Sequence, residues 1–150
     1  MIRRDQPEVL DIEEQAFGEQ AWTEEDFVKV LRQRNCIAMV AEHRELVVGY
    51  FVYELHPNRL RLLNFAVHPH YRRCRVGEQM LRKLIGKLSP QKRKRMTMAV
   101  RETNLNAQLF FRTMGFRAIR VLRDFYDGDP SEDAYLMQYR HVPGSEPTAQ

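Results

Sequence analysis

The hydrophobic pattern of the chain begins with two helices. Between Pro7 and Phe17, apolar residues recur every three or four positions, which is the spacing of one helical face. Gly18 follows directly and is a common residue after a helix C-terminus. Thr23 precedes consecutive acidic residues, a combination typical of a helix N-terminus. The sequence therefore predicts a helix over 7–17 and a second helix that starts after Thr23.

Runs rich in β-branched and aromatic residues follow at 36–42, 46–56 and 59–67. Short polar turns separate these runs, and connections this short join antiparallel neighbours. We therefore expect an antiparallel meander over this part of the chain.

The second half of the chain mixes helices and strands. From Val76 to Leu88, apolar residues repeat at helical spacing, while Arg82 and Lys83 face outward. The remaining pattern predicts a strand at 95–101, a helix at 104–114 ended by Gly115, and strands at 116–122 and 134–140. A strand–helix–strand unit requires a parallel, right-handed crossover. The order ααβββαβαββ therefore predicts a mixed α/β fold.

Length and composition limit the class of protein. With 150 residues, of which 43% are hydrophobic and 29% charged, the chain has the size and balance of one globular domain. No apolar run is long enough to span a bilayer, and the first residues lack a stretch of signal-peptide length. Cys36 and Cys74 form neither a disulfide framework nor a zinc spacing. We predict a soluble, cytoplasmic domain over 1–140, with no metal and no membrane partner, and a disordered tail over 141–150.

Charge is unevenly distributed along the chain. Residues 70–101 hold 11 of the 24 basic residues and a single acidic one, Glu78, whereas residues 1–56 hold 12 acidic and 6 basic residues. Such separation favours a polyanionic partner at the basic segment, either a nucleic acid or a phosphorylated small molecule.

The strongest local signal is the segment from Phe65 to Leu81. A strand ends near Val67, Pro69 interrupts the pattern, and an arginine-rich turn leads through Gly77 into the amphipathic helix. Backbone N–H groups at a helix N-terminus, together with arginine side chains, suit a phosphate. The alternative interpretation is an ordinary strand-to-helix turn with solvated arginines.

These motifs resemble the GNAT superfamily of N-acetyltransferases, most closely the RimI type that acetylates protein N-terminal amines. The family's acetyl-CoA motif, Arg/Gln-x-x-Gly-x-Gly/Ala, corresponds to Arg72-Arg-Cys-Arg-Val-Gly77, and its cofactor strand to Phe65-Ala-Val-His-Pro69. Further matches in order and spacing are Ala21-Trp-Thr23, Val100-Arg-Glu-Thr-Asn104, Phe110–Phe116, Phe125-Tyr126 and Glu132-Asp-Ala134. The resemblance covers residues 2–140. It implies a mixed, mostly antiparallel sheet with a splayed parallel pair at the cofactor site and helices on both faces.

The resemblance also implies acetyl-CoA as cosubstrate. The diphosphate would bind the amides of residues 73–78, the pantetheine would pair with the open strand edge at 65–67, and Asn104 would reach the pantetheine or the thioester. The implied cofactor-binding residues are Phe65, Ala66, Val67, Arg72, Arg73, Cys74, Arg75, Val76, Gly77, Glu78, Asn104 and Phe111. Arg75 departs from the usual glycine. A side chain is tolerable there if the backbone torsions are ordinary, and we hypothesise that the side chain of Arg75 strengthens coenzyme A binding.

Two other positions depart from the RimI type. Ala99 stands where a glutamate base is usual, and Phe111 where a tyrosine acid is usual, so neither side chain can transfer a proton. General acid–base groups typically contribute about 10²–10⁴-fold to the rate. We name Tyr71 and Tyr126 as candidate catalytic residues, one of which would order a water that accepts the amine proton. The alternatives are that Tyr71 packs on the helix and Tyr126 forms a groove wall. The direction of Glu102 stays open.

Other polar residues have simpler interpretations. His68 and His70 have H-x-H spacing without a nearby third ligand, which favours surface positions over a metal site. Cys74 lies among arginines, which lower a thiol pKa, yet a small packing residue is the preferred interpretation. The basic run 92–95 suits a solvated corner better than nucleic acid. Trp22 fits a wall of the substrate entrance and core packing equally well.

The leading hypothesis is an acetyl-CoA-dependent N-acetyltransferase in which a primary amine, preferably a protein or peptide N-terminal α-amine, attacks the thioester directly. The oxyanion would be held by a strand amide near Val67, and the acidic N-terminal helices would favour a cationic acceptor. The alternatives are a small-amine acetyltransferase and a CoA-binding module with little turnover, the latter because of Ala99 and Phe111. Nucleic-acid binding ranks last, and we expect a monomer or a weak dimer.

Overall fold

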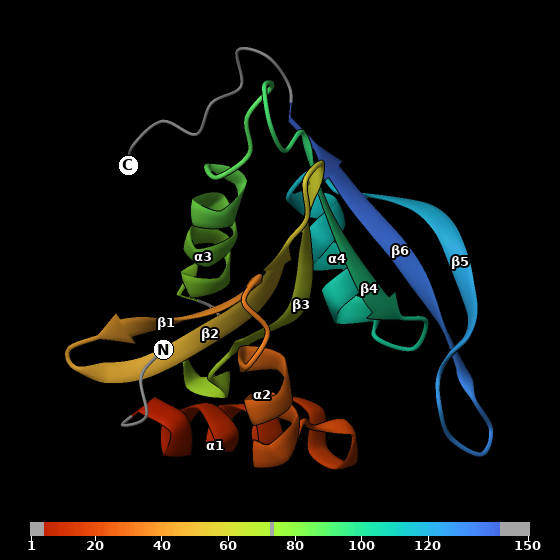
Figure 1. Cartoon of the computed structure of the whole chain (residues 1–150). Helices are drawn as coiled ribbons and strands as arrows, with labels where there is room; N and C mark the ends of the chain where they lie inside the picture. The colour runs from red at the N-terminus through yellow and green to blue at the C-terminus, as the bar shows by residue number, and fades with distance from the viewer. Residues whose placement is uncertain (1–4, 73, 142–150) are drawn as a thin grey trace. The chain divides into compact units, whose positions relative to one another are not determined.

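The computed structural model describes residues 5–72 and 74–141 (Figure 1). Its helices and strands follow the predicted order ααβββαβαββ, with two short 3₁₀ turns, η2 and η3, added. The elements are α1 (Gln6–Phe17), η2 (Gly18–Gln20), α2 (Glu24–Leu31), β1 (Cys36–His43), β2 (Leu46–Leu55), β3 (Arg59–Val67), η3 (Pro69–Tyr71), α3 (Val76–Ile85), β4 (Arg95–Arg101), α4 (Leu105–Thr113), β5 (Arg117–Tyr126) and β6 (Glu132–Arg140).

The six strands are paired in the order β1-β2-β3-β4-β6-β5. The pairs β1–β2, β4–β6 and β5–β6 are antiparallel, whereas β3 and β4 are parallel over Arg59–Leu62 and Arg95–Met98. The predicted parallel crossover through α3 and the mixed α/β fold class are therefore confirmed.

The chain divides into two compact units. The first unit comprises the residues up to Leu55 together with Leu63–Leu84, and the second comprises His56–Leu62 and the residues from Ile85 onward. Strand β3 takes part in both, because its first four residues pair with β4 in the second unit and the rest lies in the first. The predicted tail lies outside the described residues from position 142 on.

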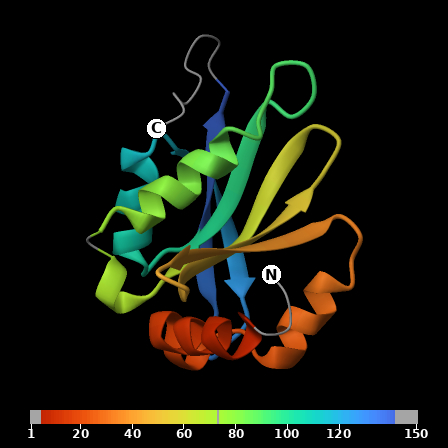
Figure 2. The same ribbon diagram turned by 90° about the vertical axis from the view of Figure 1, so that its left-hand side faces the viewer.

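In the first unit, α1 and α2 lie on one side of the β1–β2 pair and α3 lies on the other (Figures 1 and 2). The alternation of side chains along β2 explains this arrangement. Tyr50 is fully buried among residues of α1 and α2, whereas its neighbour Gly49 faces Met80 of α3. The core on the helix α1 side contains Val9, Ile12, Phe27, Ala38, Val47, Tyr50, Val52 and Ala66.

Gly49 is the residue that allows α3 to approach β2. A Cβ atom at this position would lie 2.7 Å from the Sδ atom of Met80 and 3.0 Å from the carbonyl oxygen of Ala66. Both distances are shorter than an ordinary van der Waals contact, so only glycine fits without a shift of α3 or β3.

The predicted helix ends are confirmed at both N-terminal helices. Gly18 ends α1 with a φ of 58°. Thr23 and Asp26 form a reciprocal capping box at the start of α2. Helix α3 ends at Ile85, earlier than the apolar pattern predicted. Leu88 is nevertheless buried, and its amide donates to the carbonyl of Ile85 in the turn that follows the helix.

In the second unit, α4 packs through Phe111 on Phe116, and Phe116 contacts Tyr139 of β6. Gly115 ends α4 with a φ of 99°, as predicted, and a Cβ atom there would lie 3.1 Å from the Tyr139 ring. Strand β5 is longer than predicted and runs on to Tyr126. It is an edge strand with most side chains exposed, so polar residues that resemble a turn in the sequence are tolerated there. Across the described ranges, no helix has both the length and the apolar character needed to cross a membrane.

Candidate functional site

The turn between β3 and α3 leads into the row of backbone amides at the start of α3. The amide of Cys74 donates to the carbonyl of Tyr71 (3.1 Å), and the amide of Gln79 donates to the carbonyl of Arg75 (3.1 Å). The first amides of a helix generally have no intrahelical acceptor, and residues 75–78 occupy this position in α3. This row, together with the positive end of the helix dipole, suits an anion.

Arg75 has a φ of 60°, in the left-handed region. The condition of ordinary torsions at this position is therefore not met. A non-glycine residue in this conformation costs about 1–2 kcal/mol, because its Cβ approaches the following carbonyl. The same torsion suits the glycine that the resemblance implies at this position, and it shows that the chain holds the side chain of Arg75 at the start of α3 at an energetic cost.

The side chains around this turn are mainly cationic and exposed. Arg72, Cys74 and Arg75 are exposed, whereas Arg73 lies outside the described residues. Exposure of Cys74 contradicts its interpretation as a packing residue. Glu78 forms an ion pair with Arg82 (2.7 Å), and the hydrogen bond from Arg82 lowers the pKa of this carboxyl group. The negative charge of Glu78 is therefore directed toward Arg82, one turn further into the helix.

On strand β3, next to this turn, the backbone amides alternate in direction. The amide of His68 donates to Val48 of β2 (2.7 Å), and since amides alternate along a strand, those of Val67 and Phe65 face away from β2. The Phe65 amide donates to the side-chain Oδ1 of Asn64 (2.9 Å). Of the three residues predicted to bind pantetheine, Ala66 therefore directs its backbone toward β2, Phe65 is already engaged through its amide, and Val67 offers its N–H group.

Tyr71, one of the two candidate catalytic residues, lies in the turn η3. Its ring contacts His68 and His43, with centroid distances of 5.8 and 6.2 Å. His68 also stacks on His70 (5.0 Å). Tyr71 thus packs among histidines of its own unit. No group of three or more His, Cys, Asp or Glu residues suited to a metal occurs among the residues described.

Tyr126, the other candidate, lies at the end of β5 in the second unit. Its hydroxyl donates to the carbonyl oxygen of Ala99 (3.3 Å), and the guanidinium carbon of Arg101 lies 3.7 Å from the ring centroid. Arg101 is itself held by Glu132 (2.8 Å), whose carboxylate also accepts from Thr103. Burial raises the pKa of Tyr126. Its hydroxyl therefore reaches the backbone of the residue that replaces the usual glutamate.

The other predicted residues of the second unit have mainly structural contacts. Asn104 caps α4, because its Oδ1 accepts from the amide of Ala107 (3.1 Å), which leaves its amide nitrogen for a ligand. Phe111 is 2% exposed and packs between Phe110 and Phe116. Glu102 is exposed.

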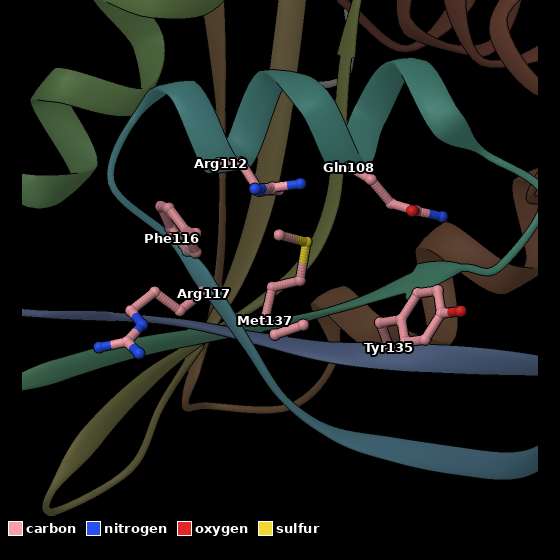
Figure 3. Close-up of a pocket in the computed structure, with 7 residues that line it drawn as sticks. Gln108, Arg112, Phe116, Arg117, Tyr135 and Met137 are labelled. Carbon is pink, nitrogen blue, oxygen red and sulfur yellow. The ribbon is translucent and has the colours of Figure 1, made fainter.

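A hollow in the second unit lies between α4 and the β5–β6 hairpin and has a volume of about 390 Å³ (Figure 3). Figure 3 shows Gln108 and Arg112 on α4 above it, with Met137 and Tyr135 on β6. None of the predicted site residues lines this hollow. It is therefore distinct from the amide row of the first unit.

Sequence reasoning missed one buried cluster in the first unit. The carboxylate of Glu13 accepts hydrogen bonds from Tyr50, Asn64 and the amide of Trp22. A signal was present, because Glu13 lies one helical turn after Val9 and next to Ile12 on the apolar stripe of α1. An acidic residue in such a stripe indicates a buried carboxylate with partners.

Comparisons with known proteins identify the family. The model of the acetyltransferase (GNAT) family matches residues 6–116. The chain is 25% identical over 134 residues to the ribosomal protein bS18-alanine N-acetyltransferase of Escherichia coli K12, and the match covers 89% of both chains. Its structure is similar to that of Ard1 from Thermoplasma volcanium, with a TM-score of 0.81 and 25% identity over 95% of each chain.

A third likeness, at 16% identity, concerns the fold alone. Naa50 of Arabidopsis thaliana, solved with the bisubstrate analogue CoA-Ac-MVNAL, gives a TM-score of 0.75 over 93% of this chain and 94% of that one. The family model spans most of the chain, and the sequence relatives are named N-acetyltransferases. The protein is therefore an N-acetyltransferase that belongs to the GNAT family.

Proposed function

We propose that the protein transfers the acetyl group of acetyl-CoA to the N-terminal α-amine of a protein or peptide. The amide row at residues 75–78, flanked by Arg72 and Arg75, is the observation that carries this proposal. The relative from Escherichia coli is named for acetylation of a ribosomal protein alanine, and the solved Naa50 complex holds an analogue that joins CoA to a peptide. Both names support a peptide acceptor over a small amine.

The residues of the first unit fit the chemical groups of acetyl-CoA. A diphosphate needs several N–H donors and a positive potential, which the start of α3 offers without any competing carboxylate, since Glu78 is paired with Arg82. Exposed guanidinium groups at Arg72 and Arg75 add charge-assisted donors. The pantetheine amides would then continue along β3, on the side of the strand that faces away from β2.

Val67 would supply the donor at the reacting carbonyl. Its N–H group faces away from β2, next to the turn that precedes the phosphate site. A preorganised amide of this kind stabilises the negative charge that develops on the carbonyl oxygen during attack, and removal of one such donor typically costs about 10²–10³-fold in rate.

Proton transfer would rely on a tyrosine and water, because Ala99 and Phe111 have no ionisable group. The hydroxyl of Tyr126 donates to Ala99, so its oxygen retains a lone pair that can accept a hydrogen bond from water or amine. Its raised pKa keeps the hydroxyl protonated at neutral pH, which suits an orienting role and excludes a strongly basic one. Tyr71 remains the alternative candidate for the same role.

Binding and transfer can be measured separately. Titration calorimetry would measure acetyl-CoA binding, and thiol release would report transfer to a peptide with a free N-terminal alanine. The same peptide with a blocked N-terminus is the control, and spermidine tests the small-amine alternative. We expect binding, transfer to the free peptide, and no transfer to the blocked one. Absence of acetyl-CoA binding would refute the proposal.

A second candidate function is a CoA-binding module with little turnover. Two observations favour it: Ala99 replaces the usual base, and Phe111 is packed in the core of its unit, where it can offer no proton. In the experiment above, acetyl-CoA binding without transfer to any amine would indicate this function.

A further inference from the structure

Glu13 is an almost fully buried carboxylate, with 1% of its surface exposed. Its Oε1 atom accepts from the hydroxyl of Tyr50 and from the Nδ2 atom of Asn64 (2.8 Å), and its Oε2 atom accepts from the amide of Trp22 (2.7 Å). Burial of a carboxylate is costly unless hydrogen bonds compensate it. The chain meets this cost with donors from a helix-to-helix connection and from two strands.

The partners of Glu13 connect the segment at Trp22 with the cofactor strand. Trp22 lies between η2 and α2, in the motif Ala21-Trp-Thr23, and a wall of the substrate entrance is one of the two interpretations given for it above. Asn64 precedes the cofactor strand segment, and its Oδ1 atom accepts from the amide of Phe65 (2.9 Å). A continuous chain of hydrogen bonds therefore runs from the Trp22 backbone, through Glu13 and Asn64, to the Phe65 backbone.

Aromatic packing supports the same chain of contacts. The Trp22 ring packs edge-on against Phe27 (5.1 Å), and Phe27 packs edge-on against Tyr50 (5.9 Å). The side chain of Trp22 is thus anchored on the core, while its amide is anchored on Glu13.

We propose that Glu13 is a positioning residue, which fixes the acceptor-side connection at Trp22 relative to the cofactor strand at Phe65. This inference rests on the proposed function, because it assigns the connection to the peptide and the strand to acetyl-CoA. Glu13 itself touches neither substrate. Its loss should weaken peptide recognition more than it weakens acetyl-CoA binding, since the proposed diphosphate site at Arg72 and residues 74–78 includes neither Glu13 nor its hydrogen-bond partners.

The substitution Glu13→Gln tests this role directly. A glutamine has one oxygen and one NH₂ group, so it cannot accept from both Asn64 and Trp22. Its NH₂ group would face either the Nδ2 atom of Asn64 or the amide of Trp22, each of which is also a donor. We expect the KM for the peptide to rise about tenfold, consistent with the loss of one buried hydrogen bond, while the Kd for acetyl-CoA changes less than about twofold. A KM for the peptide that stays at the wild-type value would overturn the proposal.

Tyr50→Phe is the matched control. It removes another donor to Glu13 but keeps the ring that packs on Phe27, and it leaves the hydrogen bonds from Trp22 through Glu13 and Asn64 to Phe65 in place. We expect lower thermal stability with an unchanged KM for the peptide. If Tyr50→Phe raises this KM as much as Glu13→Gln does, the effect is general destabilisation and the positioning role is wrong.

A backbone variant covers the case in which Glu13→Gln fails to fold. Trp22→Pro removes the amide that Glu13 holds, and the extended backbone of Ala21 (ψ 145°) accommodates a following proline. Trp22→Ala loses the same side chain but keeps the amide. We expect a higher KM for the peptide in Trp22→Pro than in Trp22→Ala, and equal values would contradict the proposal.

Hydrogen exchange gives a readout that does not require turnover. We expect the Trp22 amide to be protected in the wild type and in Tyr50→Phe, and to exchange faster in Glu13→Gln. Fast exchange of this amide in the wild type would overturn the positioning role, even if acetyl transfer is detected. Protection of this amide in a wild type that transfers no acetyl group would instead refute the proposed function and leave the hydrogen-bonded connection in place.

Discussion

The hydroxyl of Tyr126 donates a hydrogen bond to the carbonyl oxygen of Ala99, 3.3 Å away. Ala99 is the position at which the resemblance to the RimI type places a glutamate base. The hydroxyl of Tyr126, at the end of β5, therefore lies at the backbone of the β4 residue that lacks this carboxylate. The guanidinium group of Arg101 covers the ring of Tyr126. Burial raises the pKa of Tyr126, so its hydroxyl remains protonated at physiological pH and can donate this hydrogen bond.

Tyr126→Phe should lower kcat by about 10²-fold, the lower end of the range for groups that assist proton transfer. The variant keeps the ring under Arg101, so we expect little change in thermal stability and an unchanged Kd for acetyl-CoA. Steady-state kinetics with the free peptide would measure the effect, with Tyr71→Phe as the parallel variant. Full kcat in both variants would exclude both tyrosines.

Arg75 offers a test that separates backbone strain from charge. Arg75→Gly should raise the free energy of unfolding by about 1 kcal/mol, because glycine adopts a positive φ without steric cost. Arg75→Ala retains the strain and loses the guanidinium group. If the side chain binds a phosphate, both variants should raise the Kd for acetyl-CoA, as measured by calorimetry. A Kd unchanged in Arg75→Ala would show that the arginine has no part in binding.

The sequence predicted the elements whose signals are local. The capping residues Thr23 and Gly115 and the parallel crossover through α3 follow from spacing and turn chemistry alone. The positive φ of Arg75 was not predicted. In a sequence, glycine is the usual signal for a positive φ, and an arginine at this position gives no such signal. The length of β5 was underestimated because exposed edge strands carry polar residues that resemble a turn.

The candidate site was predicted where one segment contains it and missed where distant segments meet. The turn proposed to bind the diphosphate lies within a single stretch before α3, so its place at a helix N-terminus follows from the sequence. Contacts such as Tyr126 with Ala99, or Glu13 with Asn64, join residues 27 and 51 positions apart. No spacing rule links such residues, and only the packing of strands and helices brings them together.

Gly49→Ala should destabilise the first unit. The added Cβ would lie 2.7 Å from Met80 Sδ and 3.0 Å from the Ala66 carbonyl, and the backbone oxygen cannot move without shifting β3. Overpacking of this kind costs about 1–3 kcal/mol, which thermal or urea unfolding would detect. Met80→Ala combined with Gly49→Ala relieves only the sulfur contact, so we expect no full recovery. A single variant as stable as the wild type would contradict this account of how α3 packs.

Tyr50 should make the protein sensitive to alkaline pH. Burial of its ring, followed by the charge of Glu13 and their hydrogen bond, raises its pKa above the ordinary value of 10.0. A group with a raised pKa in the folded state stabilises the protein fully below its unfolded pKa and loses this contribution as pH rises beyond it. The contribution of Tyr50 to the free energy of unfolding should therefore be constant up to about pH 10. Above this pH it should decline, because the tyrosine ionises in the unfolded chain before it ionises in the folded protein. Urea unfolding between pH 8 and 11 would measure the decline, and Tyr50→Phe should start from a lower stability and decline less steeply. Parallel slopes for the two proteins would mean that another group causes the alkaline sensitivity.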